Sequence, residues 1–223
     1  MRDRLDAILR REQEEYLESL LPPREPLLAE MERFARENGH PIADAEVAQL
    51  MRILVRLKKP RRIIEVGTNI GYSVVVMGRE SDSSAVIETI ELKPEILEVA
   101  RRFVQRAKLP CRVEFHQGPA LQVLRHLSGS FDFAFIDCVK TEYSDYVEIL
   151  MPGLEDGSVL VFDNLLWKGE VAQNGSSTEA RALRKLNARL VGTPGLLSTI
   201  LPVSDGVGIT IVEKKKGAPE RAS

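Results

Sequence analysis

The sequence has few cysteines, no long apolar run and almost no net charge, and each shortage argues against a class of protein. Its 223 residues include only two cysteines, Cys111 and Cys138, which have no CxxC partner and no regular spacing. This pattern argues against a disulfide scaffold and predicts two reduced thiols in a cytoplasmic protein. No apolar run reaches the roughly 18 residues of a membrane span, and the charged start has no apolar segment typical of a signal peptide.

The balance of charges argues against a protein that coats nucleic acid. The chain has 31 basic and 33 acidic residues, a formal net charge of −2, although a local basic patch is compatible with that total. Hydrophobic residues make up 43% of the sequence and charged residues 29%, the proportions of an ordinary globular protein. A chain of this length can bury a sizeable core without disulfides or structural metals.

The first sixty residues predict helices. Apolar residues recur at helical spacing between residues 5 and 21, and Pro22 ends this run. A second helix is predicted for residues 25–38, with Gly39 as its stop. A third is predicted to begin near Asp44, a candidate N-cap residue.

From residue 61 onward, short apolar runs alternate with amphipathic segments. The apolar runs predict strands at 61–66, 86–91, 112–116, 131–136, 158–162, 197–201 and 208–212. The segments between them predict helices at 71–80, 94–107, 120–127, 142–150 and 178–191. This order predicts an α/β fold with a doubly wound, mostly parallel, seven-stranded sheet covered by helices on both faces. Too few residues separate the last two strands for a crossover helix, so an antiparallel hairpin is expected there.

A glycine turn after the first strand is the candidate cofactor site. Gly67 and Gly71 would let a ligand approach the backbone at a helix N-terminus. The next strand ends at Glu91, roughly 20 residues further on, the usual place of an acidic residue that binds a ribose diol. The dinucleotide pattern G-x-G-x-x-G would need glycine in place of Asn69 and Tyr72, so the loop favours a nucleoside ligand without phosphates over NAD. Taken alone, the loop is also compatible with a structural turn that binds nothing.

Polar residues end two neighbouring strands of the predicted sheet. Asp137 follows the strand at 131–136, and Asp163 and Asn164 follow the strand at 158–162. Ligands of doubly wound sheets bind outside the carboxyl ends of the strands, so these three side chains are expected to converge beside the glycine turn. Two carboxylates and an amide oxygen suit Mg²⁺, Mn²⁺ or Ca²⁺ rather than zinc. The alternative is that Asp163 and Asn164 open a turn and Asp137 caps the next helix.

Together these segments resemble the cation-dependent O-methyltransferases, which comprise the catechol and caffeoyl-CoA O-methyltransferases and their bacterial relatives. The resemblance runs from about Tyr16 to Val212, and its matching segments are residues 65–73, 87–91, 135–140, 163–169 and 201–206. It implies the Rossmann-like methyltransferase fold, methyl transfer from S-adenosylmethionine to a hydroxyl oxygen, and a bound Mg²⁺ (or Mn²⁺ or Ca²⁺). It also implies a homodimer.

The resemblance assigns the metal to particular residues, and the chemistry of the transfer indicates a base. It implies that Asp137, Asp163 and Asn164 hold the metal. Coordination to a cation would lower the pKa of the acceptor hydroxyl. Lys140, one helical turn beyond Asp137, would accept the proton, provided that a neighbouring cation lowers its pKa. The alternative for Lys140 is a solvated lysine at a helix start. Trp167 either lines the substrate pocket or anchors its own loop.

The resemblance also implies which residues contact S-adenosylmethionine. Glu91 would bind the ribose hydroxyls, and Ser73 with the Gly67 loop would bind the methionine carboxylate. The implied cofactor residues are Glu65, Gly67, Thr68, Gly71, Tyr72, Ser73, Glu91, Gly118, Pro119, Ala120 and Asp137, of which Gly118, Pro119 and Ala120 would lie against the adenine. Many members have an aspartate where Pro119 stands, and many bacterial members have a second aspartate where Val139 stands. The first difference removes a side-chain contact to adenine, and the second makes the local field less negative.

One domain is expected for the whole chain, because no repeat or linker divides it. Residues 1–60 would form an N-terminal helical segment, residues 61–213 the cofactor-binding α/β core and residues 214–223 a flexible tail. The expected acceptor is a small catechol-like or vicinal-diol molecule.

Three other functions stay open at this point. A rival with the same chemistry is a tRNA wobble 5-hydroxyuridine O-methyltransferase, for which the basic residues between Arg56 and Arg62 could meet phosphates. A nicotinamide-dependent dehydrogenase is disfavoured by Asn69 and the missing second glycine. A non-catalytic cofactor-binding module is disfavoured by the presence of Lys140 beside the predicted metal ligands.

Overall fold

A computed structural model describes residues 11–173 and 175–214 of the chain. Three helices come first: α1 (Arg11–Ser19), α2 (Pro26–Asn38) and α3 (Ala45–Lys58). The predicted helical run from residue 5 is described only from Arg11, and the predicted tail lies outside the described residues except for Lys214. Among the residues described, no helix is both long enough and apolar enough to cross a membrane.

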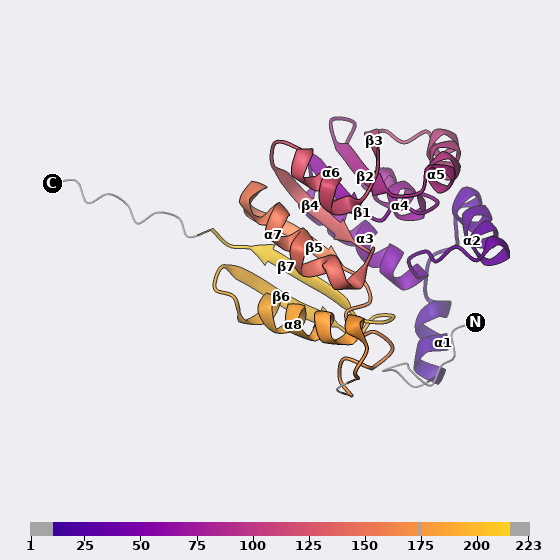
Figure 1. The fold of residues 1–223 in the computed structure, drawn as a ribbon. Coiled ribbons are helices and arrows are strands. Elements are labelled where there is room, and N and C mark those ends of the chain that lie inside the picture. Colours follow the sequence, from indigo (N-terminus) through magenta and orange to yellow (C-terminus); the bar gives the residue numbers. More distant parts are fainter. Residues whose placement is uncertain (1–10, 174, 215–223) are drawn as a thin grey trace.

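Strands and helices alternate through the rest of the chain and form one seven-stranded sheet (Figure 1). The strands are β1 (Arg62–Val66), β2 (Val86–Glu91), β3 (Arg112–Gln117), β4 (Phe131–Ile136), β5 (Leu154–Phe162), β6 (Leu196–Leu201) and β7 (Val207–Val212). The helices are α4 (Tyr72–Glu80), α5 (Pro94–Ala107), α6 (Ala120–His126), α7 (Tyr143–Leu150) and α8 (Thr178–Gly192). The order is β3-β2-β1-β4-β5-β7-β6, in which β7 runs antiparallel to both β5 and β6. The predicted doubly wound sheet and its closing hairpin are therefore confirmed.

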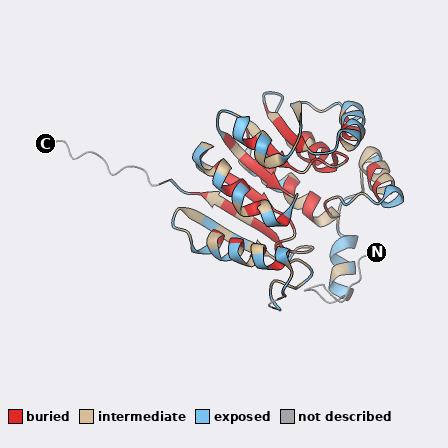
Figure 2. Cartoon of the chain, viewed as in Figure 1, coloured by how far each residue is buried: buried red, intermediate tan, exposed pale blue. Residues whose placement is uncertain are grey.

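Alternate residues of the central strands face two different layers of helices, as the period of a strand requires. Ile63 and Phe133 pack with α3 and α4 on one face, whereas Ile64 and Ala134 pack with α7 and α8 on the other. Figure 2 shows the central strands as buried along their length between these two layers. A sheet that is covered on both faces leaves its strand ends as the place where a ligand can reach it.

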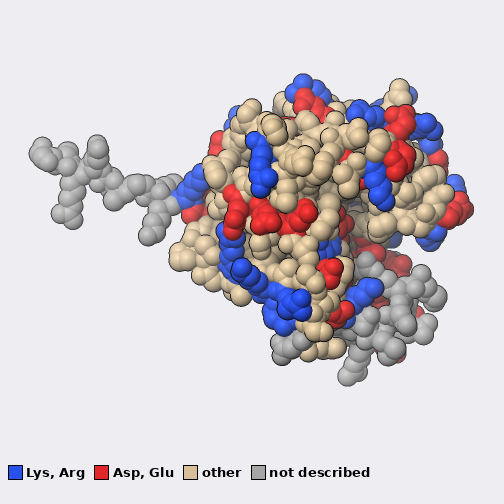
Figure 3. Space-filling view, viewed as in Figure 1, with Lys and Arg blue, Asp and Glu red and all other residues tan. Residues whose placement is uncertain are grey.

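Charges of both signs alternate over the surface seen in Figure 3. Acidic residues lie over α7 and basic residues lie along α8 beside it. Glu148 of α7 and Arg189 of α8 form an ion pair with an N–O distance of 2.8 Å. This face therefore offers no continuous basic surface to a nucleic acid.

The fifth strand is longer than the sequence predicts. It begins at Leu154 rather than at residue 158, because Leu154 pairs with Phe131 and the register shifts before the regular pairing with β4 resumes. The next pair is Val159 with Phe133, so the residues between Leu154 and Val159 form an irregularity within β5. Gly157 lies in this irregularity and adopts a positive φ of 75°.

The two predicted helix boundaries near α3 have different outcomes. Gly39 ends α2 in the left-handed conformation, with φ of 68°, as expected of a glycine stop. Asp44 occupies the N-cap position of α3, but its side chain makes no capping hydrogen bond. Its carboxylate instead accepts a hydrogen bond from the Ser204 hydroxyl in the turn between β6 and β7. The start of α3 is thereby joined to the closing hairpin.

Candidate active site

The carboxyl ends of β1, β2, β4 and β5 are held together by main-chain hydrogen bonds. The Gly67 amide donates to the Ile90 carbonyl (3.1 Å), and the Asp137 amide donates to the Val66 carbonyl (3.0 Å). The Asp163 amide donates to the Ile136 carbonyl (3.2 Å). Strand order reverses direction at β1, which has β2 on one side and β4 on the other. This is the switch point at which doubly wound sheets bind their ligands.

The glycine turn after β1 is a position where only glycine fits. Gly67 has φ of 107°, and a Cβ atom there would lie 2.2 Å from the main-chain oxygen of Asp137. The main chains that follow β1 and β4 thus lie so close together that no Cβ atom fits between them at Gly67. Gly71 caps α4 in the left-handed conformation, so α4 begins at Tyr72, one residue later than predicted.

The Glu91 carboxylate accepts hydrogen bonds from two main-chain amides, one in the glycine turn and one directly after β2. Oε2 accepts a hydrogen bond from the Asn69 amide (2.9 Å), and Oε1 accepts one from the Lys93 amide (3.0 Å). Each carboxylate oxygen has two lone pairs, so each can accept a second donor such as a ribose hydroxyl. The Gly118 amide donates to the Glu91 carbonyl (2.9 Å), which sets the turn of Gly118, Pro119 and Ala120 beside the same residue.

Glu65 is a carboxylate buried beneath this loop. It is 0% exposed, and its Oε2 accepts a hydrogen bond from the Thr89 hydroxyl at 2.5 Å. Among the described residues, its Oε1 has no hydrogen-bond partner. Burial raises the pKa of Glu65 to about 8, the Asp137 and Glu91 carboxylates add to the rise, and the Ser73 and Thr89 hydroxyls act in the opposite direction. In the ligand-free protein, the Glu65 carboxyl group therefore carries a proton at neutral pH.

Replacing Glu65 with glutamine is expected to stabilise the ligand-free protein at high pH and to change little at pH 5. The folded protein holds the Glu65 proton up to about pH 8, whereas the unfolded chain releases it near the ordinary value of 4.5. Folding therefore loses stability as the pH rises through this window, by on the order of 5 kcal/mol from this group. Urea unfolding of both proteins at pH 5 and pH 9 would test this. A variant that is less stable than the native protein at pH 9 would contradict the assignment.

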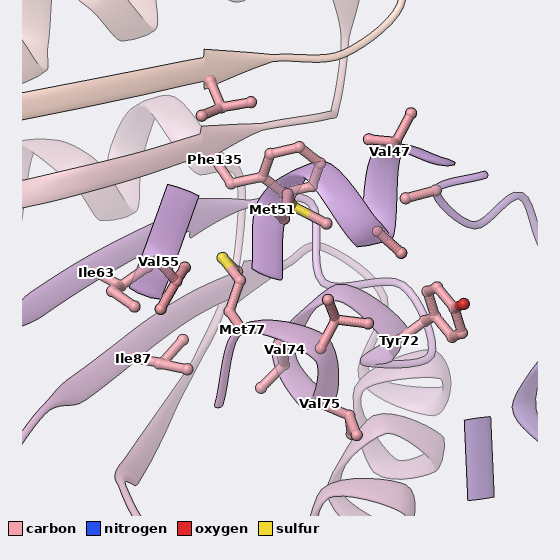
Figure 4. Packing of buried hydrophobic residues seen from close by; sticks show 14 of the residues in the cluster. Val47, Met51, Val55, Ile63, Tyr72, Val74, Val75, Met77, Ile87 and Phe135 are labelled. Carbon is pink, nitrogen blue, oxygen red and sulfur yellow. The ribbon is translucent and has the colours of Figure 1, made fainter. Parts of the chain in front are cut away.

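Tyr72 points away from the strand ends. Its hydroxyl donates to Glu32 Oε1 of α2 (2.8 Å), and Figure 4 shows its ring at the edge of the apolar group packed between α3 and α4. A cofactor contact from Tyr72 would therefore come from its main chain. Ser73, the next residue, is buried and lies close enough to Glu65 to affect the pKa of that carboxyl group.

Asp137 and Lys140 form a close pair at the end of β4. Lys140 Nζ lies 2.7 Å from Asp137 Oδ1, and its side chain is only 8% exposed. Lys140 begins a 3₁₀ turn, Lys140–Glu142, and the helix predicted from residue 142 starts after it, at Tyr143. Lys140 is therefore not a solvated lysine.

Tyr143 is a member of this group that the sequence did not identify. Lys140 Nζ donates to its hydroxyl at 2.7 Å, and that hydroxyl donates to the Asp163 carbonyl at 3.1 Å. Burial raises the pKa of Tyr143 well above its ordinary value, and the Asp137 and Asp163 carboxylates add to the rise, so the phenol stays protonated. The spacing of three residues from Asp137 to Lys140 and again to Tyr143 is the signal that was available.

Asp163 is the most buried of the predicted metal ligands. It is 3% exposed, and its Oδ1 accepts a hydrogen bond from the Asn164 amide at 2.7 Å. Burial raises the pKa of Asp163 above its ordinary value, the Asp137 carboxylate raises it further, and Lys140 lowers it. Asn164 itself has a positive φ of 61°. The Asp137 carboxylate disfavours ionisation of Asp163, and a cation bound between them would relieve this repulsion.

The loop after Asn164 is held by the closing hairpin. The Leu166 amide donates to the Asp205 carbonyl (2.9 Å), and the Lys168 amide donates to Asp205 Oδ1 (2.7 Å). Trp167 lies between them, half-buried against the apolar group on the α7 and α8 side of the sheet. Its packing fits the anchoring alternative, and a contact with the acceptor stays a prediction.

Another group of possible metal ligands lies elsewhere on the sheet. Side-chain ligand atoms of Glu88, Glu114 and His116 lie within 4.8 Å of one another. Arg62 binds Glu88 Oε1 at 2.6 Å, and Arg112 binds Glu114 Oε1 at 2.9 Å. Because these guanidinium groups already compensate both carboxylates, we interpret this group as an ion-pair network and not as a cation site.

The basic cluster proposed to meet tRNA phosphates lies at the opposite end of the sheet from this site. It occupies the end of α3 and the start of β1, whereas the glycine turn follows the end of β1. Arg56 is paired with Glu80, and Arg62 with Glu88. Two of the five cations of the cluster are therefore used in intramolecular ion pairs.

Comparison with known proteins agrees with this geometry. A family model described as O-methyltransferase matches residues 21–215. Tricin synthase 1 of Oryza sativa subsp. japonica is 31% identical over 212 residues, covering 86% of this chain and 84% of its own. Caffeoyl-CoA O-methyltransferase of Petroselinum crispum is 29% identical over 209 residues, covering 86% of each chain.

Solved structures share the fold over nearly the whole length. The O-methyltransferase of Bacillus cereus in complex with S-adenosylhomocysteine superposes with a TM-score of 0.82 at 26% identity, covering 91% of this chain and 97% of that one. The O-methyltransferase TomG of Streptomyces achromogenes in complex with S-adenosylmethionine also gives a TM-score of 0.82 at 26% identity, covering 91% and 96%. Both solved structures therefore share the fold of this chain. Each of them contains a ligand, S-adenosylhomocysteine in the first and S-adenosylmethionine in the second.

Proposed function

Because this chain belongs to the O-methyltransferase family, we propose that it methylates a hydroxyl of a small catechol-like or vicinal-diol acceptor with the help of a divalent cation. As a family member related to the caffeoyl-CoA enzymes, it is an S-adenosylmethionine-dependent O-methyltransferase. A dehydrogenase is thereby excluded. The proposal concerns the acceptor, the metal and the roles of individual residues. The observation that carries it is the chain of hydrogen bonds from Asp137 through Lys140 and the Tyr143 hydroxyl to the Asp163 carbonyl, which joins the ends of β4 and β5.

The residues at these strand ends fit a hard divalent cation. Asp137, Asp163 and Asn164 offer oxygen ligands, and a bound cation would relieve the repulsion between the two carboxylates. When bound, Mg²⁺, Mn²⁺ or Ca²⁺ would lower the pKa of the acceptor hydroxyl and fix its direction. An acceptor with two adjacent oxygens suits such an ion, and the two plant relatives are named as a tricin synthase and a caffeoyl-CoA O-methyltransferase.

Lys140 is assigned the role of general base. Its neutral amine takes the proton of the acceptor hydroxyl, the oxygen forms a bond to the methyl carbon, and the carbon–sulfur bond of S-adenosylmethionine breaks with its electron pair going to sulfur. The sulfonium is a good leaving group, so orientation of the two reactants supplies much of the acceleration.

The methyl donor is assigned to the loops after β1, β2 and β3. The Glu91 carboxylate would accept hydrogen bonds from the ribose hydroxyls. The turn at Gly118 would lie against the adenine. The Gly67 turn with Ser73 would hold the methionine carboxylate at the start of α4. Once ionised, Glu65 would accept a hydrogen bond from an ammonium group through its unpartnered Oε1. We further propose that the whole chain forms one domain and that it assembles as a homodimer.

Methyl transfer from labelled S-adenosylmethionine to catechols, caffeoyl esters and undermodified bulk tRNA tests the proposal, with Mg²⁺ and with EDTA. We expect transfer to a small diol that is lost with EDTA and restored by added Mg²⁺, because the acceptor hydroxyl needs the cation to ionise. A matched incubation with excess Mg²⁺ over EDTA controls for the chelator itself. Transfer that ignores EDTA would refute the metal assignment. Transfer to tRNA alone would replace the acceptor by the 5-hydroxyuridine rival.

A further inference from the structure

The hydroxyl of Tyr143 connects the ends of β4 and β5, and the mechanism above does not use it. Tyr143 is the first residue of α7 and is 0% exposed. Its ring packs against Tyr146 and Phe162, at centroid distances of 6.3 and 6.1 Å. A phenylalanine would fill the same space, so packing alone does not require the oxygen.

The hydrogen-bond directions at this oxygen follow from the chemistry of its partners. The Asp163 carbonyl can only accept, so the single hydroxyl hydrogen of Tyr143 is donated to it. The tyrosine oxygen must therefore accept from Lys140 Nζ. The same nitrogen donates to Asp137 Oδ1. Two N–H bonds of Lys140 are thus fixed, one by Asp137 and one by Tyr143. The remaining tetrahedral position of the nitrogen therefore has a defined direction.

We propose that Tyr143 is a positioning residue, whose hydroxyl fixes the place and rotation of Lys140 Nζ so that the remaining tetrahedral position of the nitrogen faces the acceptor hydroxyl. This inference rests on the proposed role of Lys140 as the base. In the transfer, the hydroxyl proton moves to Lys140 Nζ, the oxygen–methyl bond forms, and the methyl–sulfur bond breaks with its electron pair going to sulfur.

Asp137 alone is a poor anchor for this purpose. Its carboxylate is also assigned to the cation, so the cation and Lys140 would compete for the same two oxygens. Tyr143 is independent of that competition, because it is fixed on a main-chain carbonyl and not on a metal-ligand side chain. The lysine therefore keeps one fixed contact whatever the carboxylate binds.

The substitution Tyr143→Phe tests the inference, with Tyr146→Phe as its matched control. Tyr146 lies one turn further along α7, is equally buried, and donates its hydroxyl to Glu142 Oε2 at 2.6 Å instead of contacting Lys140. Each substitution removes one buried hydroxyl, so similar losses of stability of about 1 kcal/mol are expected. We expect kcat to fall by about 10- to 100-fold in Tyr143→Phe only, with the KM of both substrates nearly unchanged.

A double-mutant cycle with Lys140→Met separates this inference from the proposed function. If Tyr143 acts through Lys140, the double variant will have the same kcat as Lys140→Met alone. Effects that multiply, equal kcat values for the two phenylalanine variants, or unfolding of Tyr143→Phe alone would each overturn the positioning role. If Lys140→Met retains native kcat, the base assignment itself fails, which is a different result.

Discussion

Replacing Lys140 with methionine is expected to lower kcat by about 10²- to 10⁴-fold, the range that a positioned general base contributes. The side chain is nearly buried and bonded to both Asp137 and Tyr143, so its position is fixed at the point where β4 and β5 end. Methionine fills a similar volume but has no basic atom. The KM for S-adenosylmethionine should change little, because the loops assigned to the donor follow β1, β2 and β3. Steady-state kinetics at saturating donor would measure both constants.

Lys140→Arg is the matched control for this prediction. Arginine keeps a cation that can pair with Asp137, but it does not lose its proton in proteins and cannot act as a base. Both variants should therefore be equally inactive. An arginine variant with native activity would mean that Lys140 supplies only charge, and the base would have to be sought elsewhere.

Replacing Gly67 with alanine is expected to destabilise the fold by about 3 kcal/mol or more and to weaken binding of S-adenosylmethionine at least about tenfold. The added Cβ would lie 2.2 Å from the Asp137 carbonyl oxygen, so one of the two backbones must move. Either movement displaces the glycine turn or the start of the Asp137 segment. Urea unfolding and donor binding by calorimetry would measure the two effects.

Gly39→Ala isolates the contribution of backbone strain. Gly39 also has a positive φ, of 68°, but a Cβ atom there would meet nothing within 4 Å. Its substitution should therefore cost only about 1 kcal/mol and leave donor binding unchanged. Equal effects at the two glycines would show that strain, and not the close approach to Asp137, determines the cost at Gly67.

Much of this molecule could be predicted from local patterns. Apolar runs of strand length, separated by amphipathic segments, predicted the seven strands and the antiparallel hairpin that the structure contains. Polar residues directly after two such runs predicted that Asp137 and Asp163 would lie near each other, because parallel strands end at the same edge. The electrostatic effect of Asp137 on Asp163 is consistent with that placement. Their binding of a metal stays a prediction.

The remainder depends on orientation and on distant contacts. The sequence places Tyr72 in the cofactor loop, but the rotation of α4 turns its side chain toward Glu32 of α2. Lys140 was identified, whereas Tyr143 was not, because only the bend of the chain after β4 brings its hydroxyl between Lys140 and the Asp163 carbonyl. Asp44 was expected to cap its own helix, and its actual partner is far away in the sequence.

The bond between Asp44 and Ser204 joins residues that are 160 positions apart. The same hairpin turn also holds the loop that follows Asn164, through Asp205. A ribosome must therefore have released almost the entire chain before the assigned metal loop can acquire its support. Contacts of such long range are slow to form and come late in folding. A nascent chain that already contains β1 to β5 would thus still lack the contacts that hold the loop after Asn164, which form only after synthesis of the last two strands.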